Sequence, residues 1–291
     1  MSKAKKLRKI EFLGLYLICM TKNLDNEGLK SIVNNYDLFY IDLWGVVHNG
    51  ISLHQGAIEV LSNLDNLKKD YILLTNAPRP NETVKVFLKK LKMNSQQINH
   101  VYTSGQAALN YLSKNLINKS FYHIGPPRDF DLFINFKNKK IENINECEYI
   151  LCTGLFDDKS EDLNYYKDLF EKNLNKIMVC TNPDLIVDRG EKREFCAGSV
   201  AMVFEKMGGK VIYFGKPYPE VYNQAIDNKD KKILCIGDNL NTDIKGANLQ
   251  NFDSLIISDG IHKTEIENSG IEKVSKMYES IPNYIQSKLT W

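Results

Sequence analysis

The sequence predicts an α/β fold in which helices cover a parallel β-sheet. Short apolar runs alternate with amphipathic segments along residues 24–291, which is the pattern of βαβ units. Several of these runs end on polar residues in loops, where parallel strands place functional side chains. The 291 residues also exceed the roughly 100 to 200 residues of one typical domain, so two domains are expected.

Residues 1–23 are expected to be an N-terminal extension. Residues 3–9 are basic and residues 12–20 are apolar, but Glu11 separates the two runs and no small-residue cleavage site follows. The apolar run is also far shorter than the ~20 residues that span a bilayer. We therefore expect no membrane segment, and we favour Met20 over Met1 as the true start.

The elements follow from the apolar runs and the periodic segments between them. Strands are expected at residues 38–43, 71–75, 101–103, 120–124, 149–152, 177–181, 211–214, 233–236 and 254–257. Helices are expected at residues 57–69, 82–91, 105–116, 162–172, 199–207, 219–226 and 242–248.

Composition excludes some classes of partner. The 38 basic and 36 acidic residues give a net charge of +2, which argues against nucleic-acid or membrane binding through bulk charge. The six cysteines stand singly inside apolar runs and form no CxxC pair, which predicts reduced core residues, no zinc site and a cytoplasmic protein.

The segment from Tyr40 to Gly50 contains the most informative residues. Its apolar run ends on Asp42 and turns at Gly45, which is where a parallel strand presents a nucleophilic carboxylate. Two positions later stands Trp44, whose side chain has no proton to supply as an acid.

Three further loops end expected strands with polar side chains. They contain Thr75 and Asn76, then Lys216, then Asp238 and Asp243. Together with Asp42 they offer a nucleophile, hydroxyl and amide donors, a fixed cation, and carboxylates suited to a hard cation such as Mg²⁺. This set of groups indicates phosphoryl transfer.

The ordered motifs resemble those of the haloacid dehalogenase (HAD) superfamily of hydrolases. The motifs are Asp-Leu-Trp-Gly-Val, Leu-Thr-Asn, Gly-Lys-Pro and Gly-Asp-Asn-Leu-Asn-Thr-Asp. The long gap between Asn76 and Lys216 resembles the class IIA branch, and the motif sequences resemble a poorly characterised subgroup of it. The resemblance implies a Rossmann-like core from residues 24–103 and 196–291, with an inserted α/β cap at residues 104–195.

The resemblance also implies a role for each motif residue. Asp42 would attack phosphorus and form an aspartyl phosphate, and Mg²⁺ would be held by Asp42, the backbone carbonyl of Trp44 and Asp238, with Asp243 nearby. Thr75 and Lys216 would hold phosphate oxygens, and Lys216 would also restrain the Asp42 carboxylate. Trp44, Asn76 and Lys216 are expected to contact the substrate, a small phosphorylated molecule. The resemblance leaves a homodimer possible.

Trp44 departs from the family pattern. Most HAD phosphatases carry a second Asp there, which protonates the leaving oxygen and later activates water. Such acid–base help is typically worth about 10²–10⁴-fold in rate. Turnover is therefore expected to be slow, or restricted to leaving groups that depart without a proton, such as acyl or aryl phosphates.

Two alternatives to a phosphatase stay open at this stage. A dehalogenase-like hydrolase would match the aromatic residue two places after the nucleophile, but the loop from Asp238 to Asp243 would then have no purpose. A non-catalytic protein that binds a phosphate ligand or a partner is the other alternative.

Several residues have both a functional and a structural interpretation. His48 could replace the missing acid, because its ordinary pKa suits proton transfer at neutral pH; packing within the turn is the alternative. Asp238 and Asp243 could cap the helix expected near Thr242, although metal binding is favoured. Conceivable substrate selectors, each of which could instead be a turn former or a surface charge, are Arg79, Asp157, Asp158, Asp184 and Arg189.

Overall fold

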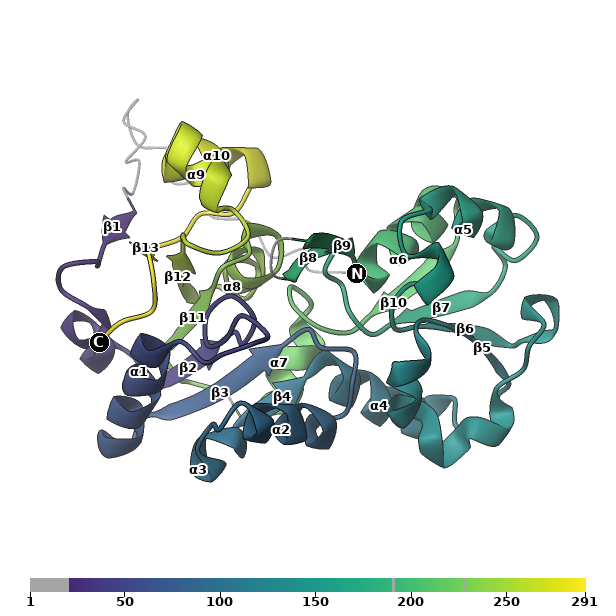
Figure 1. Cartoon of the computed structure of the whole chain (residues 1–291), viewed down its shortest axis with the longest axis horizontal. Helices are drawn as coiled ribbons and strands as arrows, with labels where there is room; N and C mark the ends of the chain where they lie inside the picture. The colour runs from purple at the N-terminus through teal and green to yellow at the C-terminus, as the bar shows by residue number, and fades with distance from the viewer. Residues whose placement is uncertain (1–20, 190–191, 228) are drawn as a thin grey trace, which may run out of the picture.

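The computed structural model describes residues 21–189, 192–227 and 229–291 (Figure 1). Among them lies a seven-stranded parallel sheet in the order β1-β13-β12-β11-β2-β3-β4. Its strands are β1 (Lys22–Asn23), β2 (Leu38–Ile41), β3 (Asp70–Thr75), β4 (Val101–Thr103), β11 (Ile233–Gly237), β12 (Asp253–Ile257) and β13 (Tyr284–Gln286). The predicted α/β class with a parallel sheet is confirmed.

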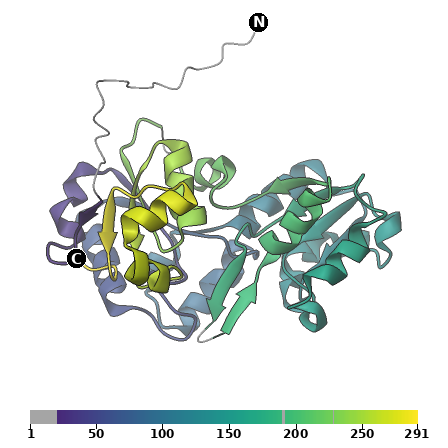
Figure 2. The ribbon, with the colours of Figure 1, turned by 90° about the horizontal axis from the view of Figure 1, so that it is seen from above.

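A second parallel sheet lies in the segment between Asn76 and Lys216. Its order is β10-β7-β6-β5, with β5 (Phe121–Ile124), β6 (Tyr149–Cys152), β7 (Ile177–Cys180) and β10 (Lys210–Tyr213). Between the two sheets lies an antiparallel pair of strands that sequence analysis did not predict, β8 (Ile186–Arg189) and β9 (Lys192–Phe195) (Figure 1). We call the part that carries the larger sheet the core lobe and the part that carries the second sheet the inserted lobe; Figure 2 shows them side by side.

The predicted helices are present in the predicted order, with small shifts at their ends, and helices that sequence analysis did not predict begin at residues 95, 263 and 271. Their bounds are α1 (Gln55–Asn66), α2 (Asn81–Lys90), α3 (Ser95–Ile98), α4 (Ser104–Asn115), α5 (Leu163–Phe170), α6 (Ala197–Lys206), α7 (Pro219–Ala225), α8 (Lys245–Gln250), α9 (Lys263–Ser269) and α10 (Ile271–Tyr278). Shorter helical segments are η1 (Leu29–Ser31), η2 (Val33–Asn35), η3 (Pro127–Lys139), η4 (Ile144–Glu146), η5 (Asp157–Lys159) and η6 (Leu240–Ile244). The helix expected at residues 242–248 is thus the π-helical turn η6 followed by α8.

The strand pairing does not match two of the expected domain boundaries, the end of the N-terminal extension and the end of the cap. Lys22 and Asn23 pair with β13, so the end of the expected extension belongs to the core sheet; residues 1–20, with Met20, lie outside the described residues. β10 pairs with β7, so a cap ending at residue 195 would lose one strand of its sheet. We propose Phe214 as the end of the inserted lobe.

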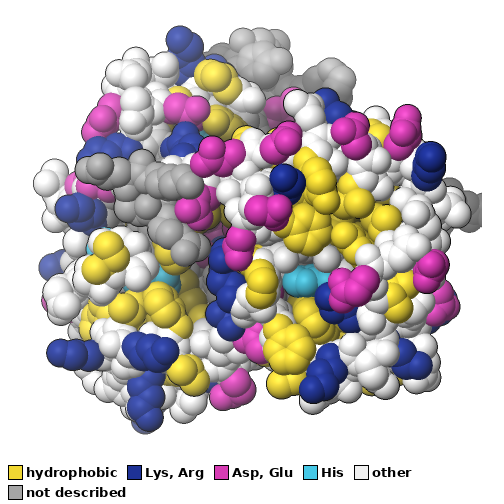
Figure 3. Space-filling view, turned by 45° about the vertical axis from the view of Figure 1, so that its right-hand side comes forward, with side chains coloured by type: hydrophobic (Ala, Val, Ile, Leu, Met, Phe, Trp, Pro, Cys, Tyr) yellow, Lys and Arg dark blue, Asp and Glu magenta, His cyan; other side chains and the backbone are white. Residues whose placement is uncertain are grey.

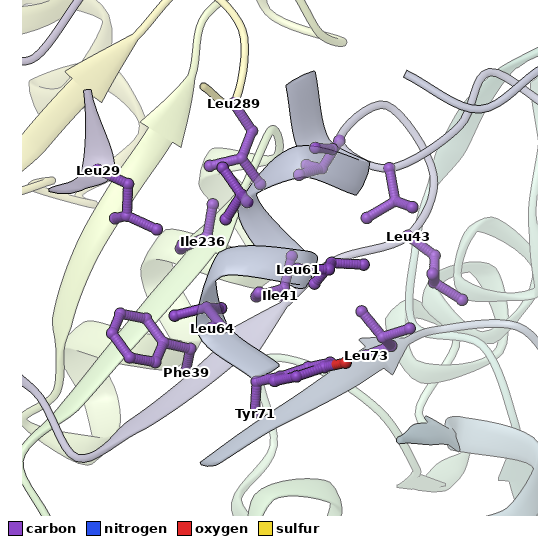
Figure 4. Close-up of a cluster of buried hydrophobic side chains, with 14 of the residues drawn as sticks. Leu29, Phe39, Ile41, Leu43, Leu61, Leu64, Tyr71, Leu73, Ile236 and Leu289 are labelled. Atoms are coloured by element: carbon purple, nitrogen blue, oxygen red, sulfur yellow. The ribbon is translucent and has the colours of Figure 1, made fainter. Parts of the chain in front are cut away.

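Both faces of β2 are buried, as expected for a central parallel strand. Phe39 and Ile41 point into a cluster with Leu61 and Leu64 of α1 (Figure 4). The alternate residues of β2 point to the opposite face, where Tyr40 packs against Tyr222 of α7. Because each fully buried side chain of this size contributes about 1.5–3 kcal/mol, the strand that ends at Asp42 is firmly held on both sides.

Surface charge agrees with the composition. On the face drawn in Figure 3, basic and acidic side chains are interspersed, which fits a net charge of +2. Within the described part of the chain, no helix has the length and apolarity that crossing a membrane requires.

Candidate active site

The candidate active site lies at the carboxyl ends of the central core strands. Asp42 directly follows β2 and Asp238 directly follows β11, and these two strands are neighbours in the sheet. Asp243 lies in η6, which begins two residues after Asp238. Oxygen atoms of these three buried carboxylates all lie within 4.8 Å of one another.

Gly45 allows the Asp42 and Asp238 loops to approach so closely. It adopts a φ of +82°, and a Cβ atom there would lie 2.2 Å from Asp238 Oδ2. Only glycine combines this backbone conformation with so short an approach. The glycine therefore lets the loop after β2 lie directly against the Asp238 carboxylate.

Lys216 is the cation of the cluster. Its Nζ donates to Asp42 Oδ1 at 2.5 Å and to the carbonyl of Leu74 at 2.9 Å, and it lies 2.7 Å from Asp243 Oδ1. Burial alone would lower the pKa of Lys216, but Asp243 and Asp42 raise it above its usual value. The side chain therefore stays charged, and it fixes the orientation of the Asp42 carboxylate.

Lys216 pairs with Asp42 and Asp243, and buried Asp238 lies beside them, so three ionised carboxylates would exceed the charge of the single ammonium group by two. Burial raises the pKa of Asp42 to about 7; Lys216 opposes the rise and Asp243 adds to it. Burial, with Asp42 and Asp243, also raises the pKa of Asp238 well above its usual value. A divalent cation bound by oxygen ligands would offset this excess charge, so the donor set fits Mg²⁺.

Asn76 has partners that sequence analysis did not foresee. Its Oδ1 accepts from the backbone N–H of Lys216 at 2.7 Å, and its Nδ2 donates to the Lys216 carbonyl and to Asp184 Oδ1, both at 3.0 Å. These contacts engage the whole amide group. The structure thus favours a role in holding Lys216 over the expected substrate contact.

The expected motif residues surround one cavity of about 380 Å³. Asp42, Trp44, Thr75, Asn76, Lys216, Asp238 and Asp243 all line it, and the inserted lobe contributes Asp184, Ile186 and Val187. The Thr75 hydroxyl accepts from the N–H of Ala77 at 3.2 Å, which holds it at the strand end. The four predicted loops are therefore brought together.

The helical turn η6 is capped by Asn239, and not by Asp238 or Asp243. Asn239 caps η6, because its side chain accepts from the N–H of Asn241 at 2.9 Å. Asp243 Oδ2 accepts from the N–H of Asn239 at 3.1 Å, and Asp238 Oδ2 accepts from the N–H of Ile261 at 3.1 Å. Asp238 is thus held by the loop after β12 and does not cap the helix.

His48 lies next to Trp44 but is not among the described residues that line the cavity. Its ring contacts Trp44 edge-on at 5.2 Å between centroids, and its Nδ1 accepts from the N–H of Gly50 at 3.0 Å. Burial, with a smaller effect of His54, lowers the pKa of His48 to about 4. At neutral pH it is an uncharged packing residue, which does not fit the hypothesis of a replacement acid.

Of the conceivable selectors, only Asp184 is found at the cavity among the described side chains. Arg79 pairs with Asp131 of η3 at 2.9 Å. Asp157 pairs with Arg128, and Asp158 lies 3.7 Å from Lys159, both on the surface of the inserted lobe. Arg189 ends β8, and its side chain lies outside the described part.

Sequence reasoning missed part of the cavity wall. Asp259, Gly260 and Ile261 follow β12 and line the cavity, as does His54 at the start of α1. The strand-end rule that identified Asp42 applies equally to Asp259, which follows the apolar run of β12. For His54 we find no signal in the sequence.

Lys216→Met is expected to lower the free energy of unfolding by about 3–5 kcal/mol, because it leaves buried carboxylates without their partner. Urea denaturation at pH 8 in the presence of EDTA measures this. Lys231→Met removes an exposed ion pair with Asp70 and serves as the matched control, with an expected loss under about 1 kcal/mol. Equal losses for the two variants would contradict the assigned role of Lys216.

Comparison with known proteins identifies the family. Residues 39–136 match a haloacid dehalogenase-like hydrolase family, and residues 213–284 match a HAD-hydrolase-like family. The crystal structure of a haloacid dehalogenase-like hydrolase from Brucella suis is 30% identical, with a TM-score of 0.79, and the match covers 91% of this chain and 99% of that one. The chain belongs to the haloacid dehalogenase-like hydrolases, and it is an enzyme.

Two further relatives have named activities. A 4-nitrophenylphosphatase of Schizosaccharomyces pombe is 25% identical over 93% of this chain and 98% of its own length. The structure of a glycerol phosphate phosphatase from Mycobacterium tuberculosis in complex with calcium is 25% identical, with a TM-score of 0.60, over 79% of this chain and 68% of that one.

Proposed function

We propose that the chain is a magnesium-dependent phosphatase that acts on a small phosphorylated metabolite through an aspartyl phosphate on Asp42. The observation that carries the proposal is the cluster of Asp42, Asp238 and Asp243 in the cavity wall, with Lys216 paired to Asp42 and Asp243. The named phosphatases among the relatives support the activity, and the calcium complex of one neighbour supports a divalent ion.

In this proposal an oxygen of Asp42 attacks phosphorus, and the bond to the leaving oxygen breaks. Water then hydrolyses the aspartyl phosphate and releases inorganic phosphate, so that one difficult step becomes two easier ones. Lys216, whose ammonium group contacts Asp42, Asp243 and the Leu74 carbonyl, restrains the attacking carboxylate, and Thr75 holds a phosphate oxygen. Mg²⁺, held by Asp42, Asp238 and the backbone carbonyl of Trp44, with Asp243 nearby, would offset the negative charge of the phosphoryl group.

Trp44 sets the expected range of substrates. Its indole packs against His48 and Gly50 and lines the cavity beside Asp42. Because neither Trp44 nor the neutral His48 suits proton transfer to a leaving oxygen, we propose slow turnover or a preference for aryl and acyl phosphates. Expected rates of phosphate release fall from 4-nitrophenyl phosphate and acetyl phosphate to glycerol phosphate.

The two other functions predict different results in the same assay. A phosphate-binding protein without activity would bind inorganic phosphate and release none from any ester. A dehalogenase-like hydrolase would release halide without metal, but such chemistry has no use for the carboxylates of Asp238 and Asp243. The proposed site is therefore better matched to phosphoryl transfer. The possible homodimer and the cytoplasmic location remain predictions.

Magnesium is expected to stabilise the protein more at pH 7.5 than at pH 5.5. The pKa of Asp42 is raised to about 7 in the folded protein, so the carboxylate takes up a proton as the pH falls through this value and loses its attraction for the cation. Saturation at 100 times the dissociation constant contributes about 2.7 kcal/mol, or several degrees in melting temperature at pH 7.5.

Thermal unfolding with and without Mg²⁺ at the two pH values measures this effect. Asp238→Asn, which removes a carboxylate of the proposed site, is expected to lose most of the magnesium-dependent shift. Equal shifts at both pH values, or a full shift in Asp238→Asn, would count against a magnesium site built from these carboxylates.

A further inference from the structure

Arg193 of β9 connects the inserted lobe to the loop that holds a metal carboxylate. Its Nη2 donates to the carbonyl of Ile261 in the core lobe at 3.4 Å. The N–H of the same Ile261 donates to Asp238 Oδ2 at 3.1 Å. One residue of the loop after β12 therefore lies between the arginine and the carboxylate.

This loop packs closely on Asp238 and is hydrogen-bonded to its carboxylate. A Cβ atom at Gly260 would lie 2.2 Å from the Cβ of Asp238. Protein interiors at such packing density transmit small displacements between neighbouring groups. The orientation of Asp238 thus depends on where residues 260 and 261 lie.

The core lobe also presents an anchored anion near the arginine. Glu265 of α9 accepts from Tyr278 Oη at 3.0 Å, and His262 Nδ1 lies 2.7 Å from Glu265 Oε2. Burial acts to raise the pKa of Glu265, but His262, Tyr278 and Arg193 lower it below its usual value. The guanidinium of Arg193 is thus attracted to this region by Glu265 as well as by the Ile261 carbonyl.

We propose that Arg193 is a positioning residue that couples the inserted lobe to magnesium binding at Asp238. β8, the antiparallel partner of β9, carries Ile186 and Val187 at the cavity. With β8 at the cavity wall, Arg193 Nη2 donates to the Ile261 carbonyl, and the Ile261 N–H donates to the Asp238 carboxylate. The inference rests on the proposed function, because it assumes the metal site of that proposal.

The test measures Mg²⁺ affinity by isothermal titration calorimetry on the full chain without substrate, so it does not depend on turnover. Arg193→Ala is expected to raise the dissociation constant about two- to three-fold, the lower end of the range for one hydrogen bond, because this bond is long and exposed. Arg193→Lys, which keeps the charge and a donor, should recover part of the affinity. Arg128→Ala removes an exposed arginine paired with Asp157 and should leave the affinity unchanged.

Glu265→Gln keeps the proposal falsifiable if Arg193→Ala folds poorly. It is expected to raise the Mg²⁺ dissociation constant, as Arg193→Ala does. In the double variant, the increase in the dissociation constant should be smaller than the product of the two single increases. In phosphatase assays of Arg193→Ala, excess Mg²⁺ should restore kcat.

The outcomes separate the two proposals. Loss of Mg²⁺ binding in Asp238→Asn together with wild-type affinity in Arg193→Ala and Glu265→Gln would overturn the coupling and leave the metal site standing. Unchanged Mg²⁺ binding in Asp238→Asn would overturn the metal site, and the coupling with it.

Discussion

Asp42→Asn is expected to abolish phosphate release, with a loss of at least about 10³-fold in kcat, because an amide cannot form the covalent phosphoenzyme. Asp42 is the carboxylate that Lys216 Nζ holds at 2.5 Å, so the substitution removes the nucleophile at the centre of the cluster. Release of 4-nitrophenolate from 4-nitrophenyl phosphate at saturating Mg²⁺ measures the change.

The same variant should not unfold more readily. In the folded protein the pKa of Asp42 is raised to about 7, which means that the fold disfavours the charged form, and a neutral amide avoids that cost. Lys216 keeps Asp243 and the Leu74 carbonyl as partners. In metal-free buffer at pH 7.5 we expect an unchanged or higher melting temperature. Residual turnover above about a tenth of wild type would exclude Asp42 as the nucleophile.

Trp44→Asp is expected to raise kcat/KM on glycerol phosphate by about 10²–10⁴-fold, the usual contribution of a general acid and base. The side chain at position 44 lines the cavity two residues after Asp42, so a carboxyl group there can reach the leaving oxygen. The effect on acetyl phosphate and 4-nitrophenyl phosphate should be much smaller, because these groups depart without a proton. The measurement that decides is therefore the ratio of kcat/KM on glycerol phosphate to kcat/KM on 4-nitrophenyl phosphate, compared between Trp44→Asp and wild type.

Trp44→Asn is the matched control for Trp44→Asp. It also removes the indole, and the Asn side chain has the size of Asp but no acidic proton. Both variants lose the packing of the indole against His48 and Gly50, so their melting temperatures should fall together. A gain on glycerol phosphate in both variants would assign the effect to space in the cavity. No gain in either would mean that proton transfer does not limit the rate.

The local sequence pattern determined most of the core lobe. Alternating residues of β2 carry apolar side chains to both faces, which requires a sheet that is covered on both sides, and the polar residues that follow strands necessarily gather at one edge of a parallel sheet. Asp42, Thr75, Asp238 and Asp243 were found in this way. Asp259 follows the same rule and could have been found too.

Other features depended on contacts between residues that are distant in sequence. β1 is two residues long and β13 is three. They are strands only because β1 pairs with β13 and β13 pairs with β12. β10 belongs to the second sheet because its register matches β7, and its sequence reads equally well as a core strand. Short strands have no periodicity of their own that could reveal their partner.

The sequence by itself determined which groups are available for chemistry: a strand-end carboxylate at residue 42, a lysine, two further aspartates, and a tryptophan where an acid would serve. Only the tertiary structure decided what each group does with its neighbours. It engaged the Asn76 amide with Lys216 and Asp184, buried His48 as a neutral ring, and joined Arg193 to Asp238 through Ile261. The physical reason is that burial, pKa and hydrogen-bond partners are set by the surroundings of a side chain, and those surroundings exist only once the two lobes are folded together.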